Sequence, residues 1–166
     1  MILGITTSTY TLMHVLISRV GIGSGLVVLY GLLNGKRFDG WTAFYLTTTV
    51  ATSVTGFAFP FHKLLPSHVV GAISLLVLAV AIVARYGLQL AGGWRPVFVI
   101  SVALALYLNV FVAVVQSFLK APVLKALAPT QKEPPFMVAQ LVVLLIFVGL
   151  TILAAKRFHA EQARTA

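Results

Sequence analysis

Long apolar runs separated by short polar stretches organise this chain. Five runs, at residues 11–33, 41–59, 68–90, 96–119 and 136–155, are nearly free of charged residues. A helix of about 20 apolar residues crosses the roughly 30 Å hydrocarbon layer of a bilayer. The pattern therefore predicts an all-α fold, a bundle of five transmembrane helices that forms a single transmembrane domain over residues 1–166.

The links between the runs predict turns and one short helix. "NGKRFDG" and "AGGWR" are short and rich in glycine, and Ser67 is positioned to cap the third helix. In the longest link, "APVLKALAP" lies between Pro122 and Pro129, and we expect a short amphipathic helix on the membrane surface there. The following "TQKE" has the pattern of a capping box, but prolines come directly after it and disfavour a helix at that point.

Composition narrows the class of protein. Of the 166 residues, 60% are hydrophobic and only 9% are charged, which indicates that lipid covers most of the surface. The chain has no cysteine, which excludes disulfides and thiolate chemistry. The formal charge is +9, but the basic residues form small groups between apolar runs, as at membrane edges. We therefore expect the lipid bilayer and anionic lipid head groups as partners, and no nucleic acid.

The order of the charges predicts how the chain crosses the membrane. No lysine or arginine precedes the first run, and Lys36 and Arg37 follow it. Basic residues are enriched in cytoplasmic loops, so we expect an exported N-terminus. With five spans, the C-terminus is then cytoplasmic.

Three histidines, His14, His62 and His68, fall on the outer side in this topology. Histidine ligates haem iron and other metals, so a group of three would be able to hold haem b between the first and third spans, or a divalent metal. However, His62 and His68 are six residues apart rather than four, and no cysteine or carboxylate lies nearby. We therefore predict no metal site and interpret all three as interfacial side chains that reach toward head groups.

Arg19 is the one charged residue in the first run. An arginine at the centre of a span costs about 3 kcal/mol, whereas one near the end of a span reaches the interface with its long side chain. We expect Arg19 to lie near the outer end and to act as an anchor. The alternative is a clamp for an anionic head group or a substrate carboxylate.

Neutral polar side chains mark the interior. Asn109 lies near the middle of the fourth run, and Gln116 follows seven residues later on the same helical face. We interpret both as groups that bond to neighbouring helices, and the alternative is a polar line along a pore or a quinone pocket. The second run is rich in hydroxyls, and the first contains Gly21 and Gly25 four residues apart. Small residues at this spacing predict close packing of the first two helices.

Two stretches carry a resemblance, "ALYLNVFVAVVQSFLKAPVLKALAPTQKEPPFMVAQ" and "FPFHKLLPSHVVGAISLLVLAVAIVARYG". They resemble a group of small, uncharacterised multi-span inner-membrane proteins of proteobacteria. The resemblance covers most of the chain, from the first span to the fifth. It implies a location in the bacterial inner (cytoplasmic) membrane and no particular activity.

The motifs leave three functional hypotheses. No run contains aspartate or glutamate, whereas ion-coupled transporters and pumps normally place one inside a span. The leading hypothesis is a non-enzymatic accessory or structural membrane subunit that has a membrane-protein partner or forms a homo-oligomer. One alternative is a haem- or quinone-binding redox protein that uses the outer-side histidines. The other is a passive small-solute carrier lined by Asn109, Gln116 and the hydroxyls of the second run.

Overall fold

The computed structural model describes residues 4–59 and 66–164, with side chains described at 4–59 and 68–158. All of its long elements are helices, which confirms the all-α prediction. They are α1 (Thr7–Leu33), α2 (Asp39–Phe57), α3 (Pro66–Ile82), the π-helical turn η1 (Val83–Gly87), α4 (Trp94–Lys120), the short α5 (Pro122–Leu127) and α6 (Pro134–Arg164).

Four stretches of the described chain are long and apolar enough to cross a membrane. They are Thr7–Leu33, His68–Gly87, Trp94–Lys120 and Pro134–Phe158. The expected second span, α2, is not among them, because seven of its 19 residues are threonine or serine, which lowers its hydropathy. The long helices therefore lie where the sequence predicts them, while the count of five spans is not confirmed.

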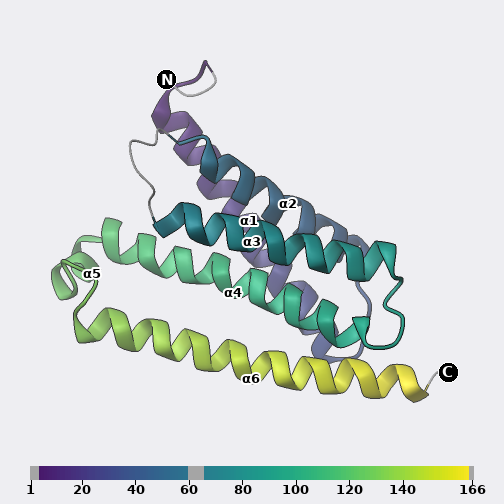
Figure 1. Ribbon diagram of the computed structural model, residues 1–166. Coiled ribbons are helices and arrows are strands. Elements are labelled where there is room, and N and C mark those ends of the chain that lie inside the picture. The colour runs from purple at the N-terminus through teal and green to yellow at the C-terminus, as the bar shows by residue number, and fades with distance from the viewer. Residues whose placement is uncertain (1–3, 60–65, 165–166) are drawn as a thin grey trace.

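The five long helices run up and down beside one another (Figure 1). The start of α1, the end of α2, the start of α3, the end of α4 and the start of α6 lie together, and we call this the N-terminal end of the bundle. The turns after α1 and after η1 lie at the opposite end with the end of α6, and we call this the C-terminal end. Helix α4 packs on α1, α3 and α6, and α1 packs most extensively on α2, as its glycines predict.

Helix α1 is capped at both ends. The hydroxyl of Thr6 accepts a hydrogen bond from the backbone N–H of Thr9, 3.2 Å away, which starts the helix four residues before the expected span. At the other end, Gly35 has a φ of 66°, and the N–H of Lys36 donates to the carbonyl of Gly31 at 2.9 Å. The left-handed conformation of Gly35 ends α1, and a short link then leads to the start of α2 at Asp39.

The buried core draws residues from all five long helices, and α1, α2 and α4 approach one another closely within it. The ring of Tyr45 in α2 is fully buried, and its hydroxyl donates to the backbone carbonyl of Val102 in α4 at 3.0 Å. Gly25 in α1 makes room for it, since a Cβ at this position would lie 2.7 Å from the Tyr45 ring and 2.6 Å from Leu106. This close approach holds three helices together at one point.

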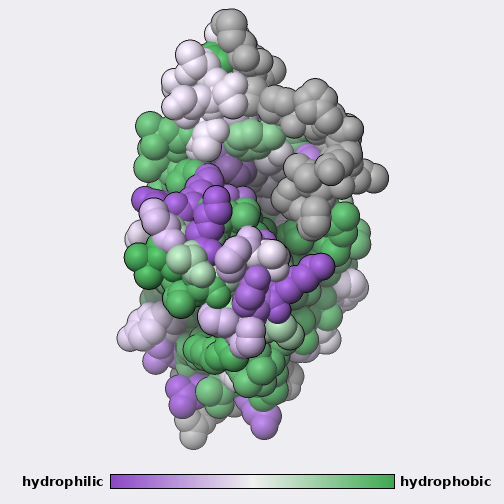
Figure 2. Space-filling view, turned by 90° about the vertical axis from the view of Figure 1, so that its left-hand side faces the viewer, coloured by the Kyte–Doolittle hydropathy of each residue, from purple (hydrophilic) through white to green (hydrophobic). Residues whose placement is uncertain are grey.

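The segment between α4 and α6 contains the expected short helix. In α5, the side chains of Val123 and Leu127 are 73% and 52% exposed, so this helix presents apolar groups to the surroundings. The "TQKE" stretch does not start a helix, as predicted, because α6 begins only at Pro134. The Glu133 carboxylate nevertheless makes half of the capping-box contact, since it accepts from the backbone N–H of Thr130 at 3.2 Å, and it also accepts from the Thr130 hydroxyl at 2.8 Å. Figure 2 views the molecule from the left-hand side of Figure 1, where α5 lies, and shows hydrophilic patches among apolar areas.

Candidate functional site

His14 lies at the N-terminal end, between α1 and the end of α2. Its Nδ1 is 2.9 Å from the hydroxyl of Thr55, and that hydroxyl donates its own proton to the carbonyl of Ala51 at 2.7 Å. The tautomer of His14 with its proton on Nδ1 satisfies both contacts, since His14 then donates to Thr55 while Thr55 donates to Ala51, and in this tautomer the lone pair on Nε2 is available. The ring also packs edge-on against Phe59, with 5.2 Å between ring centroids.

His68 lies at the start of α3 and reaches the same end of α2. Its side chain is 6% exposed, and its ring lies 5.9 Å from that of Phe57. The third expected histidine, His62, lies outside the described residues. Within residues 4–59 and 68–158, no group of three or more potential metal-ligating side chains comes together.

Arg19 lies farther into its helix than the sequence suggests. Because Thr6 caps α1 early, Arg19 is twelve residues from the helix start, or about 18 Å at 1.5 Å per residue. The side chain is exposed on the outer face of the bundle. Arg19 therefore lies near the middle of α1 rather than a few residues from its start.

A polar notch lies in the interior where α1, α2 and α4 meet. Gly21 has no side chain, and a Cβ there would lie 3.5 Å from the Thr49 hydroxyl and 3.9 Å from the Asn109 amide nitrogen. Both polar atoms are buried, and neither has a hydrogen-bond partner among the described residues. Gln116, two turns after Asn109, is half-buried and does not join this notch.

A further amide in α6 was missed by the sequence analysis. Gln140 donates from Nε2 to the backbone carbonyl of Phe111 in α4 at 3.3 Å, and its Oε1 is buried without a partner among the described residues. The signal was present in the sequence, as the one amide within an otherwise apolar run. It ties α6 to α4 in the way that was expected of Asn109 and Gln116.

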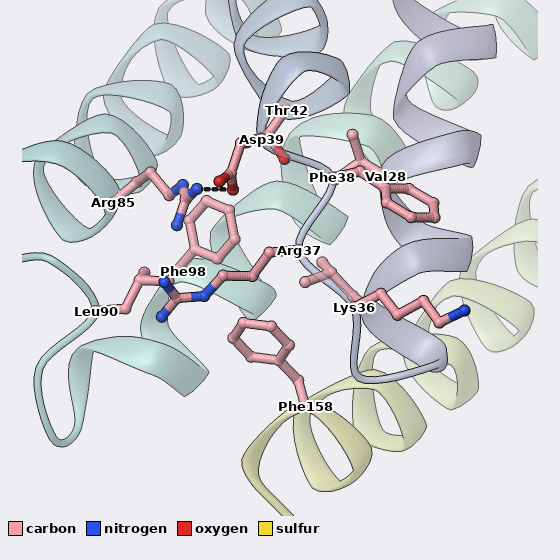
Figure 3. A pocket seen from close by; sticks show the side chains of 11 residues that line it. Val28, Lys36, Arg37, Phe38, Asp39, Thr42, Arg85, Leu90, Phe98 and Phe158 are labelled. Atoms are coloured by element: carbon pink, nitrogen blue, oxygen red, sulfur yellow. Dashed lines mark hydrogen bonds and ion pairs between the residues drawn. The ribbon is translucent and has the colours of Figure 1, made fainter. Parts of the chain in front are cut away.

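The C-terminal end holds a charged cluster that the sequence analysis did not assemble. Arg85 in η1 forms an ion pair with Asp39 at the start of α2 (Figure 3). A recess lined by Arg37, Asp39 and Arg85, among others, lies beside this pair. In Figure 3, the Arg37 side chain extends across this recess beneath the ion pair, whereas Lys36 points away from Arg85. Sequence alone does not bring these residues together, because Asp39 and Arg85 are 46 positions apart.

Two more arginines at this end donate hydrogen bonds to backbone carbonyls of other segments. Arg95, at the start of α4, donates from Nε to the carbonyl of Leu90 at 3.1 Å. Arg157, near the end of α6, donates to the carbonyl of Leu33 at 3.3 Å. Both bonds satisfy carbonyls at the ends of elements, where no helical partner is present.

Comparison of the chain with protein-family models, with curated proteins and with solved structures finds no match.

Proposed function

We propose that this chain is an integral protein of the bacterial inner membrane in which all five long helices cross the bilayer. Four of them have the length and hydropathy that this requires. The 19 residues of α2 extend about 28 Å at 1.5 Å per residue, close to the hydrocarbon thickness. Its hydroxyls bond back to carbonyls one turn earlier, for example Thr52 to Thr48 at 2.9 Å, which lowers the cost of burying them in lipid.

We propose that the N-terminus is outside and the C-terminus is cytoplasmic. The described cations gather at the C-terminal end, which the positive-inside rule favours for the cytoplasmic side. They are Lys36, Arg37, Arg85, Arg95, Lys156 and Arg157, against Lys120, Lys125 and Lys132 at the N-terminal end. Fusions at Ala166 test this: a fluorescent protein should be active and a periplasmic phosphatase inactive, and the reverse result inverts the orientation.

Within the membrane, the role that we propose is that of a non-enzymatic accessory or structural subunit. One observation carries it: buried polar groups bond between helices, as Tyr45 does to Val102 and Tyr10 does to Thr55 at 2.8 Å. Such bonds rigidify a bundle.

Photo-crosslinking in native membranes tests the role of subunit. A photoreactive residue at Leu145 in α6, 61% exposed, should yield protein adducts at native expression levels, whereas one at the fully buried Leu106 should not. A second probe at Leu76 in α3, 68% exposed, samples another face. Lipid adducts alone at Leu145 and Leu76 would contradict the role of subunit.

The notch beside Gly21 supports a second candidate, a passive carrier of small polar solutes. Unpartnered buried groups such as Thr49 and Asn109 offer hydrogen bonds to a solute that a filled interior does not. Uptake of urea or glycerol into proteoliposomes tests this. The rate should exceed that of empty vesicles and should fall for Asn109→Leu; equal rates for protein-containing and empty vesicles reject the carrier.

The free Nε2 of His14 supports a third candidate, a haem- or quinone-binding redox protein. The outer-side histidines would supply axial ligands from α1 and α3. An absorption spectrum of the protein purified in mild detergent tests this directly. A Soret band lost in His14→Ala supports it, and colourless protein without extractable quinone rejects it.

A further inference from the structure

The C-terminal end of the bundle combines an excess of positive charge with a recess. Six described cations lie at this end, and the only carboxylate among the described side chains there is Asp39. The recess opens beside the turn between α1 and α2 and is lined by Arg37, Asp39, Arg85, Leu90, Phe98 and Phe158, among others. Its interior volume is about 10 Å³, which is the size needed by roughly one water molecule. A larger anion would therefore bind at the mouth, between the guanidinium groups.

The backbone around the recess departs from regular geometry. The last turn before it is the π-helical η1, a form that often marks functional sites. After one intervening residue, Leu88, the residues Gln89 and Leu90 have φ values of 50° and 57°, although neither is glycine. Two consecutive left-handed residues of this kind are strained, and they persist only where surrounding contacts hold them.

Leu90 makes contacts that hold this turn in place. Its side chain is 1% exposed and lines the recess, and its carbonyl accepts the bond from Arg95. The strained turn thus connects the end of η1, which carries Arg85, to the start of α4, which carries Arg95, at the same end of the bundle (Figure 1).

The Arg85–Asp39 pair is unequal in exposure. The Arg85 side chain is 12% exposed, whereas the Asp39 side chain is 70% exposed. The guanidinium is therefore fixed in the wall of the recess, and its carboxylate partner stands on the open side. An incoming anion can replace Asp39 without uncovering Arg85, and arginine binds phosphate oxygens with two parallel hydrogen bonds.

We infer that the mouth of this recess, with Arg37 and Arg85, binds the phosphate group of an anionic membrane lipid. The inference rests on the proposed membrane embedding, because a cytoplasmic-side recess beside the span ends then faces the head-group layer. The excess of cations over Asp39 favours a lipid with net negative charge over a zwitterionic one. Free phosphate has the same chemistry, and the experiment separates the two sources.

Thermal unfolding of the full chain in nanodiscs tests the inference. Discs of pure phosphatidylcholine are compared with discs containing increasing fractions of phosphatidylglycerol, and the wild type should be stabilised by the anionic lipid. Arg37→Gln should raise the lipid fraction that gives half of the effect by more than about fivefold, because it loses a bidentate phosphate contact as well as the general attraction of one basic residue to an anionic surface. Lys132→Gln, at the other end of the bundle, is the matched control: it loses only the general attraction, so its shift should be no more than about fivefold and smaller than that of Arg37→Gln.

Asp39→Asn distinguishes a binding site from a purely structural ion pair. Removing the competing carboxylate should lower the half-effect lipid fraction, even if the variant is less stable in phosphatidylcholine alone. If Arg37→Gln does not fold, Arg37→Lys replaces it, with a weaker response expected because lysine lacks the bidentate fork. Equal responses of wild type, Asp39→Asn and the Arg37 variant overturn the inference.

Two further measurements distinguish lipid phosphate from free phosphate and test the membrane embedding on which the inference rests. Inorganic phosphate added to detergent-solubilised protein should not reproduce the stabilisation at matched ionic strength, and if it does, the ligand is free phosphate and the lipid assignment is wrong. Resistance to alkaline carbonate extraction tests membrane embedding on its own. If the protein resists extraction but does not respond selectively to anionic lipid, only the lipid-binding inference is contradicted. If carbonate extracts the protein, the proposed membrane embedding is contradicted as well.

Discussion

Gly25 of α1 lies against the ring of Tyr45 of α2 so closely that a Cβ on Gly25 would be 2.7 Å from the ring. The ring has little freedom to withdraw, because it is fully buried and its hydroxyl is bonded to the carbonyl of Val102. The third wall of this contact is Leu106, also fully buried. The contact therefore fixes the distance between α1 and α2.

Gly25→Ala should destabilise the protein by about 1–3 kcal/mol, because the added methyl group overpacks a core that cannot move aside. Gly23→Ala is the matched control, since a Cβ at Gly23 meets nothing within 4 Å and alanine favours the helix by up to about 1 kcal/mol. Thermal unfolding in detergent measures both. Equal shifts for the two variants would show that the close approach at Gly25 is unimportant.

Tyr45→Phe isolates the hydrogen bond from the packing. The ring stays in place while the bond to the Val102 carbonyl is lost, so a loss of about 0.5–1.5 kcal/mol is expected. Tyr30→Phe is the control, because the Tyr30 side chain is 64% exposed. If denaturation midpoints of Tyr45→Phe and Tyr30→Phe coincide, the bond between α2 and α4 adds nothing to stability.

The helices were predictable because lipid imposes long apolar runs, and the runs are visible residue by residue. Their ends were less predictable. The early start of α1 depends on the Thr6 cap, and the turn after η1 places Gln89 and Leu90 in the left-handed conformation although neither is glycine. The sequence is divided over α2, because its length suits a span whereas its seven threonine and serine residues lower its hydropathy.

The charged cluster was not predictable, for a different reason. Asp39 and Arg85 meet because α2 packs beside α3, which η1 continues. The sequence does not specify which helices become neighbours. The close packing of α1 and α2 was predictable from Gly21 and Gly25, since small residues four positions apart indicate a helix–helix interface within one stretch of sequence. Charges at span ends carry no such local signal.

Asn109→Leu is expected to stabilise the protein by about 1 kcal/mol in detergent. The sequence alone predicts the opposite, since an interhelical bond would be lost. In the structure the Asn109 amide nitrogen is buried without a partner among the described residues, so its removal relieves a desolvation cost. Gln116→Leu, at a half-buried position on the same helix, should change stability by no more than about 0.5 kcal/mol.

The sign of the Asn109→Leu effect is informative about the notch beside Gly21. A loss of stability would mean that a bound water or solute satisfies the amide in the native protein. Gly21→Ala should then reproduce part of that loss, because its Cβ would occupy the space between the amide and the Thr49 hydroxyl. Unchanged stability for Gly21→Ala, together with a gain for Asn109→Leu, supports a dry notch.

The turn before α6 should lose order in acid. Contact with the surrounding chain acts to raise the pKa of the Glu133 carboxyl, but hydrogen bonds from Thr130 and from the backbone of Lys132 outweigh it and hold the pKa below its ordinary value of 4.5. A carboxyl whose pKa is lowered by folding stabilises the fold above its unfolded pKa, and this contribution disappears as the pH falls through the folded pKa. Amide hydrogen-exchange protection over residues 121–136 should therefore be higher in the wild type than in Glu133→Gln at about pH 7. The two should converge as the pH falls below 4.5 and through the lowered pKa of the Glu133 carboxyl. Thr130→Val should lower protection at neutral pH and narrow this pH dependence, because it removes one of the bonds to the carboxylate. A difference between wild type and Glu133→Gln that stays constant across this range would mean that the carboxylate's charge does not order the turn.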